Sequence, residues 1–168
     1  MPLPDAEQLV RQLALALKPR LRPNAALVGI HSGGAWVAQK VHQQLGGKLP
    51  LGSLDISFYR DDFNRIGLHP LVAPSDIPFE VEGAHIILID DVLYTGRTVR
   101  AAMNELYDYG RPAAIELAVL IDRGGHELPI TANVVGAHMT LAEDQTIQVS
   151  LNSDNQLTLS LHERRDAP

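Results

Sequence analysis

The sequence predicts an α/β fold in which helices flank a mostly parallel β-sheet. Residues 84–89 and 115–121 are nearly unbroken aliphatic runs, as expected of parallel strands that are buried on both faces. Between the predicted strands, apolar residues recur at the 3.6-residue period of a helix. Because strand, turn and helix alternate along the chain, we expect right-handed crossovers between neighbouring parallel strands.

The first part of the chain predicts a helix, a strand and a second helix. Asp5 is placed to cap a helix whose apolar residues recur at helical spacing over residues 9–17. A short apolar run at residues 25–30 predicts a buried strand. That strand ends in the turn 31–34, which contains two adjacent glycines, and helical spacing resumes over residues 36–45.

The next region predicts one strand and one long loop. Within residues 51–59, Leu54, Ile56 and Phe58 alternate with polar side chains, which is the period of a half-exposed strand. Residues 60–78 show no periodicity and include three prolines. A structureless segment of this length inside a compact domain is usually functional, so we expect a flexible lid loop over residues 60–78.

The second half of the chain predicts a helix between two buried strands. Asp90 and Asp91 end the first of these strands, and the helix that follows has Gly110 as its C-terminal stop. The second strand, at residues 115–121, ends in the turn 122–125. Two of the predicted strands therefore end in turns that carry carboxylates.

A C-terminal β-hairpin completes the predicted fold. Aliphatic and polar residues alternate on both sides of residues 152–155, which is the pattern of two antiparallel strands and their turn. The chain has 168 residues and no internal repeat, so it has the size of one ordinary domain with a single apolar core. We expect one domain over residues 1–168.

The composition excludes several classes of protein. With no cysteine, the chain has no disulfide, thiolate zinc site, iron–sulfur cluster or cysteine nucleophile. Its 14 basic and 20 acidic residues give a net charge of -6, which argues against a dedicated nucleic-acid-binding protein. No N-terminal leader pattern is present, and no aliphatic run approaches the roughly 20 residues of a membrane span. We expect a cytoplasmic protein without membrane partners.

A strand, loop and helix carry the pattern with the clearest chemical meaning. A buried strand delivers Asp90 and Asp91 to its carboxyl end, and a loop with Thr95, Gly96 and Thr98 opens directly into a helix. Backbone N–H groups at a helix N-terminus, together with the threonine hydroxyls, can bind a phosphate. The carboxylates suit ribose hydroxyls or a hydrated Mg²⁺ ion. A 5-phosphorylated sugar satisfies both halves of such a site.

Other phosphate and metal motifs fail on inspection. Gly29, Gly33 and Gly34 do not form the G-x-G-x-x-G pattern of dinucleotide binding, and no G-K-[ST] of a P-loop is present. The seven histidines include no H-E-x-x-H motif and no pair spaced four residues apart. His31 and His126 flank the predicted crevice and are weaker candidates for substrate contact.

The segment from Ile86 to Thr98 resembles the phosphoribosyl pyrophosphate binding signature of the type I phosphoribosyltransferases. With Leu93 and Tyr94 between the aspartates and the phosphate loop, it is similar to one branch of them, the pyrimidine operon regulator (PyrR) family. The resemblance also covers residues 27–30, 54–62, 70–72, 110–112, 117–124 and 127–130. It implies a type I phosphoribosyltransferase-like sheet, mostly parallel and flanked by helices.

The resemblance implies a uracil phosphoribosyltransferase, which makes UMP and pyrophosphate from uracil and phosphoribosyl pyrophosphate with Mg²⁺. Asp90 and Asp91 match the catalytic positions that hold ribose and the Mg²⁺ shell, in part through water, and Arg60 is a cation placed to reach pyrophosphate. The residues that match the phosphoribosyl pyrophosphate binding signature are Asp90, Asp91, Val92, Leu93, Tyr94, Thr95, Gly96, Arg97 and Thr98.

Two further turns match functional positions of the family. Ser32, Gly33 and Gly34 match its pyrophosphate loop, and Asp122 and Arg123 match the strand end over which uracil lies. The family usually has an arginine where this chain has Gly33, so one positive contact to pyrophosphate is missing. We expect backbone amides to bind the anion there, with weakened activity.

The resemblance also implies partners other than the substrates, namely RNA, UMP as an effector, and further copies of the chain in a homo-oligomer. RNA-binding members carry a histidine and an arginine directly after the Asp-Arg-Gly turn, where this chain has Gly125 and His126. Because one fixed cation is lost in a chain of net charge -6, we expect little RNA binding. Two alternatives stay open: a UMP-responsive RNA-binding attenuator with little enzymatic role, and a purine phosphoribosyltransferase.

Overall fold

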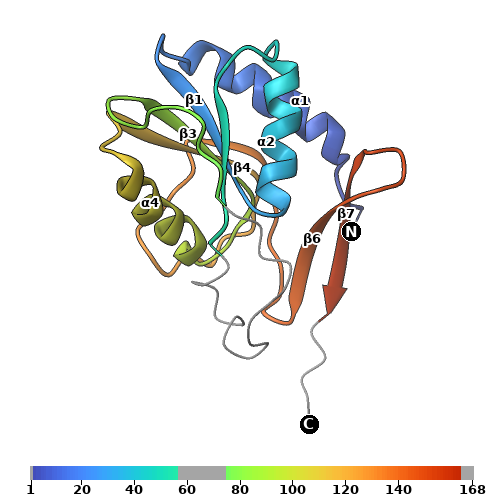
Figure 1. Cartoon of the computed structure of the whole chain (residues 1–168). Helices are drawn as coiled ribbons and strands as arrows, with labels where there is room; N and C mark the ends of the chain where they lie inside the picture. The colour runs from blue at the N-terminus through green and yellow to red at the C-terminus, as the bar shows by residue number, and fades with distance from the viewer. Residues whose placement is uncertain (1, 57–74, 164–168) are drawn as a thin grey trace.

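The structure, a computed structural model, describes residues 2–56 and 75–163. These residues form a five-stranded sheet and a separate two-stranded hairpin, and Figure 1 shows helices on both faces of the sheet. The sheet has the order β2-β1-β3-β4-β5, and all of its pairings are parallel. Its strands are β1 (Ala25–Ile30), β2 (Leu51–Leu54), β3 (His85–Leu93), β4 (Ala114–Asp122) and β5 (Val134–His138).

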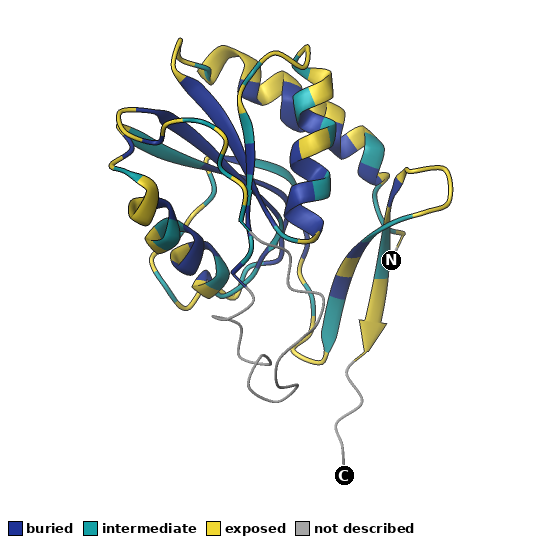
Figure 2. Cartoon of the chain, viewed as in Figure 1, coloured by how far each residue is buried: buried dark blue, intermediate teal, exposed yellow. Residues whose placement is uncertain are grey.

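Helices α1 (Ala6–Leu17) and α2 (Gly33–Gln44) cover one face of the sheet, and α4 (Arg97–Tyr109) covers the other (Figure 1). A short 3₁₀ turn, η1 (Lys18–Arg20), extends α1. Figure 2 shows that the central strands are buried and that each helix exposes only its outer side. The aliphatic runs in β3 and β4 are thus buried on both faces, and the predicted parallel sheet flanked by helices is confirmed.

The predicted C-terminal hairpin is also confirmed. Its strands β6 (Gln145–Leu151) and β7 (Leu157–Glu163) pair antiparallel outside the main sheet. The side chain of Lys40 donates a hydrogen bond of 2.5 Å to the carbonyl of Asn155, and Glu7 accepts the backbone N–H of Leu157 at 3.3 Å. These contacts attach the hairpin to α1 and α2.

The parallel order brings the turns that follow β1, β3 and β4 to one edge of the sheet. Gly29 is in register with Ile89, and Ile89 is in register with Ala118, so the three strands end close together. Ligand crevices of parallel α/β sheets lie outside the carboxyl ends of the strands. The same edge therefore carries the glycines after β1, the aspartates of β3 and the turn after β4.

Several predicted boundaries differ from the observed ones. Helix α2 begins at Gly33, so the predicted glycine turn is its first turn. Strand β3 does not end at Asp90 but continues to Leu93, because β4 pairs with it as far as Asp122. Strand β5 was not predicted, since its apolar run is short and interrupted by Gly136.

Two predicted helix boundaries, the start of α1 and the end of α4, are confirmed. Asp5 caps α1 by accepting the backbone N–H of Glu7 at 3.0 Å and of Gln8 at 3.4 Å, and Gly110 follows the last residue of α4. Most of the predicted lid, with Arg60, falls within residues 57–74 and lies outside the described residues. No helix in the described ranges is long and apolar enough to cross a membrane.

Candidate active site

The loop between β3 and α4 forms an open pocket at the N-terminus of α4. Gly96 caps this helix with a φ of 97°, a left-handed conformation that favours glycine. A cavity of about 140 Å³ lies here, and its lining residues are Asp90, Val92, Leu93, Tyr94, Thr95, Gly96, Thr98 and Val99. We call residues 94–98 the phosphate loop, because they place helix N-terminal amides around a concave site.

The phosphate loop is held in place by its neighbours. The carbonyl of Thr95 accepts the backbone N–H groups of Glu127 and Leu128 at 2.9 and 3.1 Å, and its hydroxyl accepts that of Arg97 at 3.3 Å. A Cβ added to Gly96 would lie 3.1 Å from the side chain of Ile130. The loop therefore has a fixed shape, which lowers the entropy that ligand binding must overcome.

The aspartate pair lies directly behind this pocket. Asp90 is only 3% exposed, and its Oδ1 accepts the backbone N–H of Asp91 at 2.8 Å. Oδ1 of Asp91 accepts the N–H of Val92 at 2.7 Å. These local bonds fix the orientation of both carboxylates at the carboxyl end of β3.

The two glycines at the start of α2 pack against the aspartate pair. A Cβ added to Gly33 would lie 2.1 Å from Oδ2 of Asp91, and one added to Gly34 would lie 2.7 Å from the carbonyl oxygen of Ile89. The peptide bond between His31 and Ser32 is cis. Because Gly33 and Gly34 carry no side chains, the N-terminus of α2 approaches β3 closely.

The turn after β4 closes the third side of the site. Asp122 is buried, and its Oδ1 accepts the backbone N–H of Gly124 and Nε2 of His126, both at 2.9 Å. The backbone N–H of Arg123 donates to the carbonyl of Leu93 at 3.1 Å. The turn is therefore anchored on the strand that leads into the phosphate loop.

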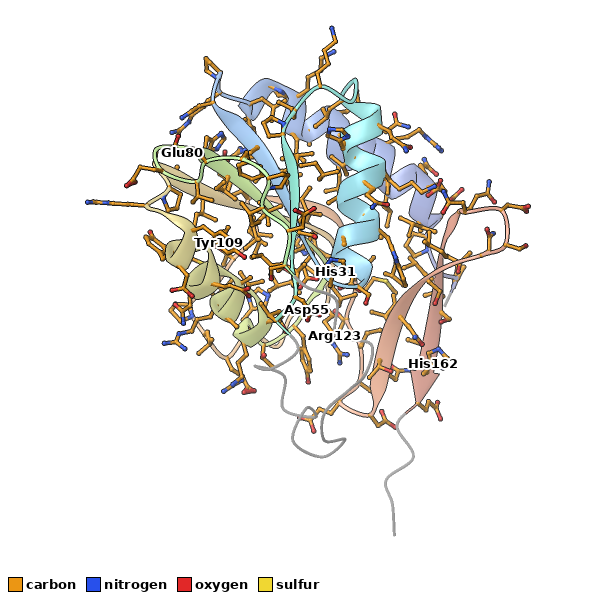
Figure 3. All side chains as sticks on the ribbon, in the orientation of Figure 1. His31, Asp55, Glu80, Tyr109, Arg123 and His162 are labelled. Carbon is orange, nitrogen blue, oxygen red and sulfur yellow. The ribbon has the colours of Figure 1, made fainter. Side chains whose placement is uncertain are left out.

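Arg123 links this turn to the phosphate loop and to the hairpin. Its guanidinium lies 3.9 Å from the ring centroid of Tyr94, which is a cation–π contact. It donates to the carbonyls of Gln145 at 2.8 Å and Ala142 at 3.3 Å, and the residue is 8% exposed. Figure 3 shows Arg123 and His31 near the carboxyl-end edge of the sheet.

The structure brings together all the described site residues that the sequence singled out. The groups at 32–34, 90–98 and 122–123 meet at one sheet edge. The contacts of Arg123 with residues 142 and 145 were not predicted, because backbone carbonyls carry no sequence signal. The pairing of His126 with Asp122 was also missed, although their spacing of four residues was visible.

A network of charged side chains lies on β4, toward the opposite end of the sheet. Burial raises the pKa of Glu116, but hydrogen bonds from Arg20 and His85, and their charges, outweigh burial and lower it. Nε of Arg20 lies 2.7 Å from one carboxylate oxygen, and Nε2 of the buried His85 lies 2.5 Å from the other. This network stabilises the amino ends of β3 and β4 and is separate from the phosphate loop.

Comparison with known proteins gives the class of this site. The phosphoribosyl transferase domain family matches residues 4–154. A hypoxanthine phosphoribosyltransferase structure from Staphylococcus aureus has a TM-score of 0.63 at 19% identity and covers 84% of this chain and 76% of its own. A purine phosphoribosyltransferase from Pyrococcus horikoshii has a TM-score of 0.61 at 22% identity, with coverages of 79% and 82%. Fold and site thus define a type I phosphoribosyltransferase domain.

Two relatives narrow this class. A protein named Bifunctional protein PyrR from Pseudomonas fluorescens is 53% identical over 163 residues, which are 95% of this chain and 97% of that protein. One of the same name from Nitrosococcus oceani is 53% identical over 163 residues, with coverages of 94% and 91%. The chain belongs to the PyrR family of phosphoribosyltransferases, as its sequence motifs predicted.

Proposed function

We propose that this protein transfers the phosphoribosyl group of phosphoribosyl pyrophosphate to uracil, giving UMP and pyrophosphate. The open cavity at the N-terminus of α4, bordered by Asp90, carries the proposal. Membership in the PyrR family supports uracil as the acceptor. In such a displacement the protein acts mainly by positioning the reactants and by stabilising the charge that develops.

In this proposal the 5′-phosphate lies against the backbone amides of residues 95–98 and the hydroxyls of Thr95 and Thr98. The positive end of the α4 dipole favours this anion. The side chain of Asp90, buried behind the loop, and that of Asp91 then face the ribose hydroxyls. The fixed loop and the oriented carboxylates together hold C1′ toward the turn after β4.

The aspartate pair fits a Mg²⁺ ion that arrives with the substrate. Within residues 2–56 and 75–163, no group of three or more histidine, cysteine or acidic side chains forms a metal site. Mg²⁺ usually keeps several waters and binds one or two carboxylates together with substrate phosphates, which matches two adjacent aspartates. When bound, the ion would supply positive charge to the leaving pyrophosphate, and Asp90 and Asp91 would hold its shell, directly or through water.

Ser32, Gly33 and Gly34 form the pyrophosphate loop in this proposal. They open α2, so its first amides and its dipole face the anion. Gly33 replaces the arginine that is usual in the family, and the space beside it is filled by the carboxylate of Asp91. Arg60 supplies a further cation to pyrophosphate.

A parallel assay of acceptors tests the proposal. Purified protein is incubated with phosphoribosyl pyrophosphate, Mg²⁺ and either uracil, hypoxanthine or guanine, and the nucleotide products are quantified. We expect UMP with uracil and at least 100-fold lower kcat/KM with either purine, about 2.7 kcal/mol of discrimination. Turnover of a purine at the rate of uracil, or no product with uracil, would contradict it.

Regulation through RNA is the second candidate function, because the relatives are named bifunctional. Our expectation is weak binding, since the net charge is -6 and Arg123 is buried against Tyr94. Another cation of this region, Arg97, is paired with Glu127 at 2.6 Å. Filter binding of pyrimidine-leader RNA and scrambled RNA, with and without UMP at physiological salt, distinguishes the two: tight, UMP-stimulated binding of the leader alone would establish the regulator.

The proposal includes a homo-oligomer of two or more copies that acts in the cytoplasm. Light scattering coupled to size exclusion tests the oligomer, which is expected to have a mass at least twice the 18.3 kDa of one chain. Fractionation of cells tests the location. A monomer across the micromolar range would contradict the first part of this statement, and a membrane-bound fraction the second.

A further inference from the structure

A carboxylate and an imidazole form a hydrogen-bonded pair at the carboxyl end of β4. Asp122 is 8% exposed, and its Oδ1 lies 2.9 Å from Nε2 of His126. Because an ionised carboxylate only accepts hydrogen bonds, the imidazole carries its proton on Nε2. Its Nδ1 is then the basic nitrogen.

The segment that carries His126 is fixed onto the phosphate loop on both sides. Just before it, a Cβ added to Gly125 would lie 2.6 Å from the ring of Tyr94, so the backbone packs on that ring. Just after it, Glu127 donates its backbone N–H to the carbonyl of Thr95 at 2.9 Å. The side chain of His126 is 25% exposed, so it is open to a ligand beside the phosphate loop.

The proposed reaction needs a proton acceptor at the nucleobase. N1 of uracil carries a hydrogen, which must leave as N1 bonds to C1′, because the glycosidic nitrogen of UMP is neutral and carries no hydrogen. We propose that Nδ1 of His126 accepts this proton, while Asp122 orients the ring and stabilises the imidazolium. This inference rests on the proposed function.

In this single displacement, each bond that forms is matched by one that breaks. The N1–H bond of uracil breaks and a bond from hydrogen to Nδ1 of His126 forms. The N1–C1′ bond forms, while the bond from C1′ to the pyrophosphate oxygen breaks and its electron pair leaves with pyrophosphate. The proton on His126 then passes to solvent, to which the side chain is open.

Arg97, Glu127 and Arg123 lie near the pair but are engaged with other partners. Besides Asp122, the titratable and charged residues around His126 within residues 2–56 and 75–163 are Tyr94, Arg97, Arg123, Glu127 and His138. Arg97 and Glu127 bind each other at 2.6 Å, and Arg123 faces the hairpin. His138 lies 4.0 Å from Oδ2 of Asp122 and is 77% exposed. Asp122 is therefore the group that sets the tautomer of His126.

The test compares wild type with His126→Gln, across pH and with two acceptors. We expect the variant to lower kcat/KM for uracil about 100-fold, within the range of general-base catalysis, and to flatten the acid limb of the pH profile. With 5-fluorouracil, whose N1–H is more acidic, the loss should shrink to about 10-fold or less, because a base contributes less there. Asp122→Asn should behave in the same direction, because it disturbs the tautomer.

His162→Gln is the matched control, since His162 lies in the exposed last part of β7, where its Nε2 lies 2.9 Å from the hydroxyl of Ser160 (Figure 3). Its kcat/KM values with uracil and 5-fluorouracil should equal those of wild type. Calorimetry with phosphoribosyl pyrophosphate should give the same affinity for His126→Gln as for wild type within about two-fold, which separates a chemical role from a misfolded loop. An unchanged acid limb, or an equal loss with uracil and 5-fluorouracil, in an active wild type would overturn the role of His126 alone. No UMP from wild type would overturn the proposed function with it.

Discussion

The proposed phosphate end of the site and its proposed nucleobase end differ in how many parts of the chain build them. The phosphate end comes from one continuous stretch, residues 90–98, in which β3 runs into a loop and then into α4. The nucleobase end combines the turn 122–128 with the ring of Tyr94 and with backbone carbonyls near the start of the hairpin. One end is therefore local in sequence, and the other depends on tertiary packing.

Substitutions at the two ends should therefore affect catalysis in different ways. A change in the continuous stretch should act on ligand groups directly, since Asp90 and the residues of the phosphate loop line the cavity. A change at Arg123 in the nucleobase end, by contrast, must pass through its packing contacts with Tyr94 and the hairpin before it reaches the ligand. We therefore expect larger and more specific kinetic effects from residues 90–98 than from the packing contacts around residue 123.

Replacing either aspartate should have the largest effect. Asp90→Asn and Asp91→Asn each remove a charge from an oriented site without changing volume, so kcat should fall about 10²- to 10³-fold with little loss of fold. Steady-state kinetics and circular dichroism measure both. Asp108→Asn, on the exposed side of α4, is the matched control and should leave kcat unchanged. Near-normal rates for both active-site variants would contradict the assignment.

Gly96→Ala should have the next largest effect. At a φ of 97°, an alanine costs about 1–2 kcal/mol, and its Cβ would press on Ile130 at 3.1 Å. Gly46→Ala is a matched control, since Gly46 has a φ of 99° and no neighbour within 4 Å of an added Cβ. Both variants should unfold at lower urea concentrations than wild type. Only Gly96→Ala should weaken phosphoribosyl pyrophosphate binding, by about 10-fold or more. Equal affinities in the two variants would place the phosphate elsewhere.

Arg123→Gln should have a smaller and less specific effect. It removes the cation over Tyr94 and the hydrogen bonds to the carbonyls of Ala142 and Gln145, which should cost about 1–3 kcal/mol of unfolding free energy. We expect KM for uracil to rise several-fold, while affinity for phosphoribosyl pyrophosphate changes less. Urea titrations and steady-state kinetics measure these effects, and a loss confined to phosphoribosyl pyrophosphate binding would argue against two separately built ends.

Glu116→Gln should have the smallest effect and none on catalysis. Burial raises the pKa of Glu116, but Arg20 and His85 lower it overall, so its ionised form stabilises the fold above the pKa of the unfolded chain. That contribution is lost as pH falls through the lower folded pKa. The variant should be roughly 1 kcal/mol less stable than wild type near pH 7, with the difference shrinking in acid. Urea titrations of both proteins at several pH values measure this difference in stability. A difference that grows in acid would contradict the lowered pKa of Glu116.

The sequence predicted the elements with strong local signals. Asp5 caps α1 through its own side chain, and the aliphatic runs of β3 and β4 are buried on both faces, so each signal lies within a few residues. The phosphate loop belongs to the same group, because all the residues that line its pocket lie within residues 90–99. Its roles in ligand binding remain predictions.

The features that the sequence did not predict depend on contacts between distant segments of the chain. Strand β5 is a short edge strand whose pairing with β4 orders it, and its sequence alone is too weak to predict it. Gly33 and Gly34 were predicted as a turn, but they begin α2, with the aspartates of β3 packed directly against them. Likewise Arg123 donates its hydrogen bonds to backbone carbonyls, which every residue has, so the sequence does not indicate the acceptors.

A crystal structure with UMP and Mg²⁺ tests the central claim most directly, namely that the continuous stretch binds the phosphate. The account predicts the 5′-phosphate on the amides of residues 95–98, the ribose hydroxyls toward Asp90 and Asp91, and the base beside the turn 122–128. It would be contradicted by a phosphate bound only elsewhere, such as beside Arg97 and Arg100 on the outer side of α4, or by a phosphate loop closed by side chains.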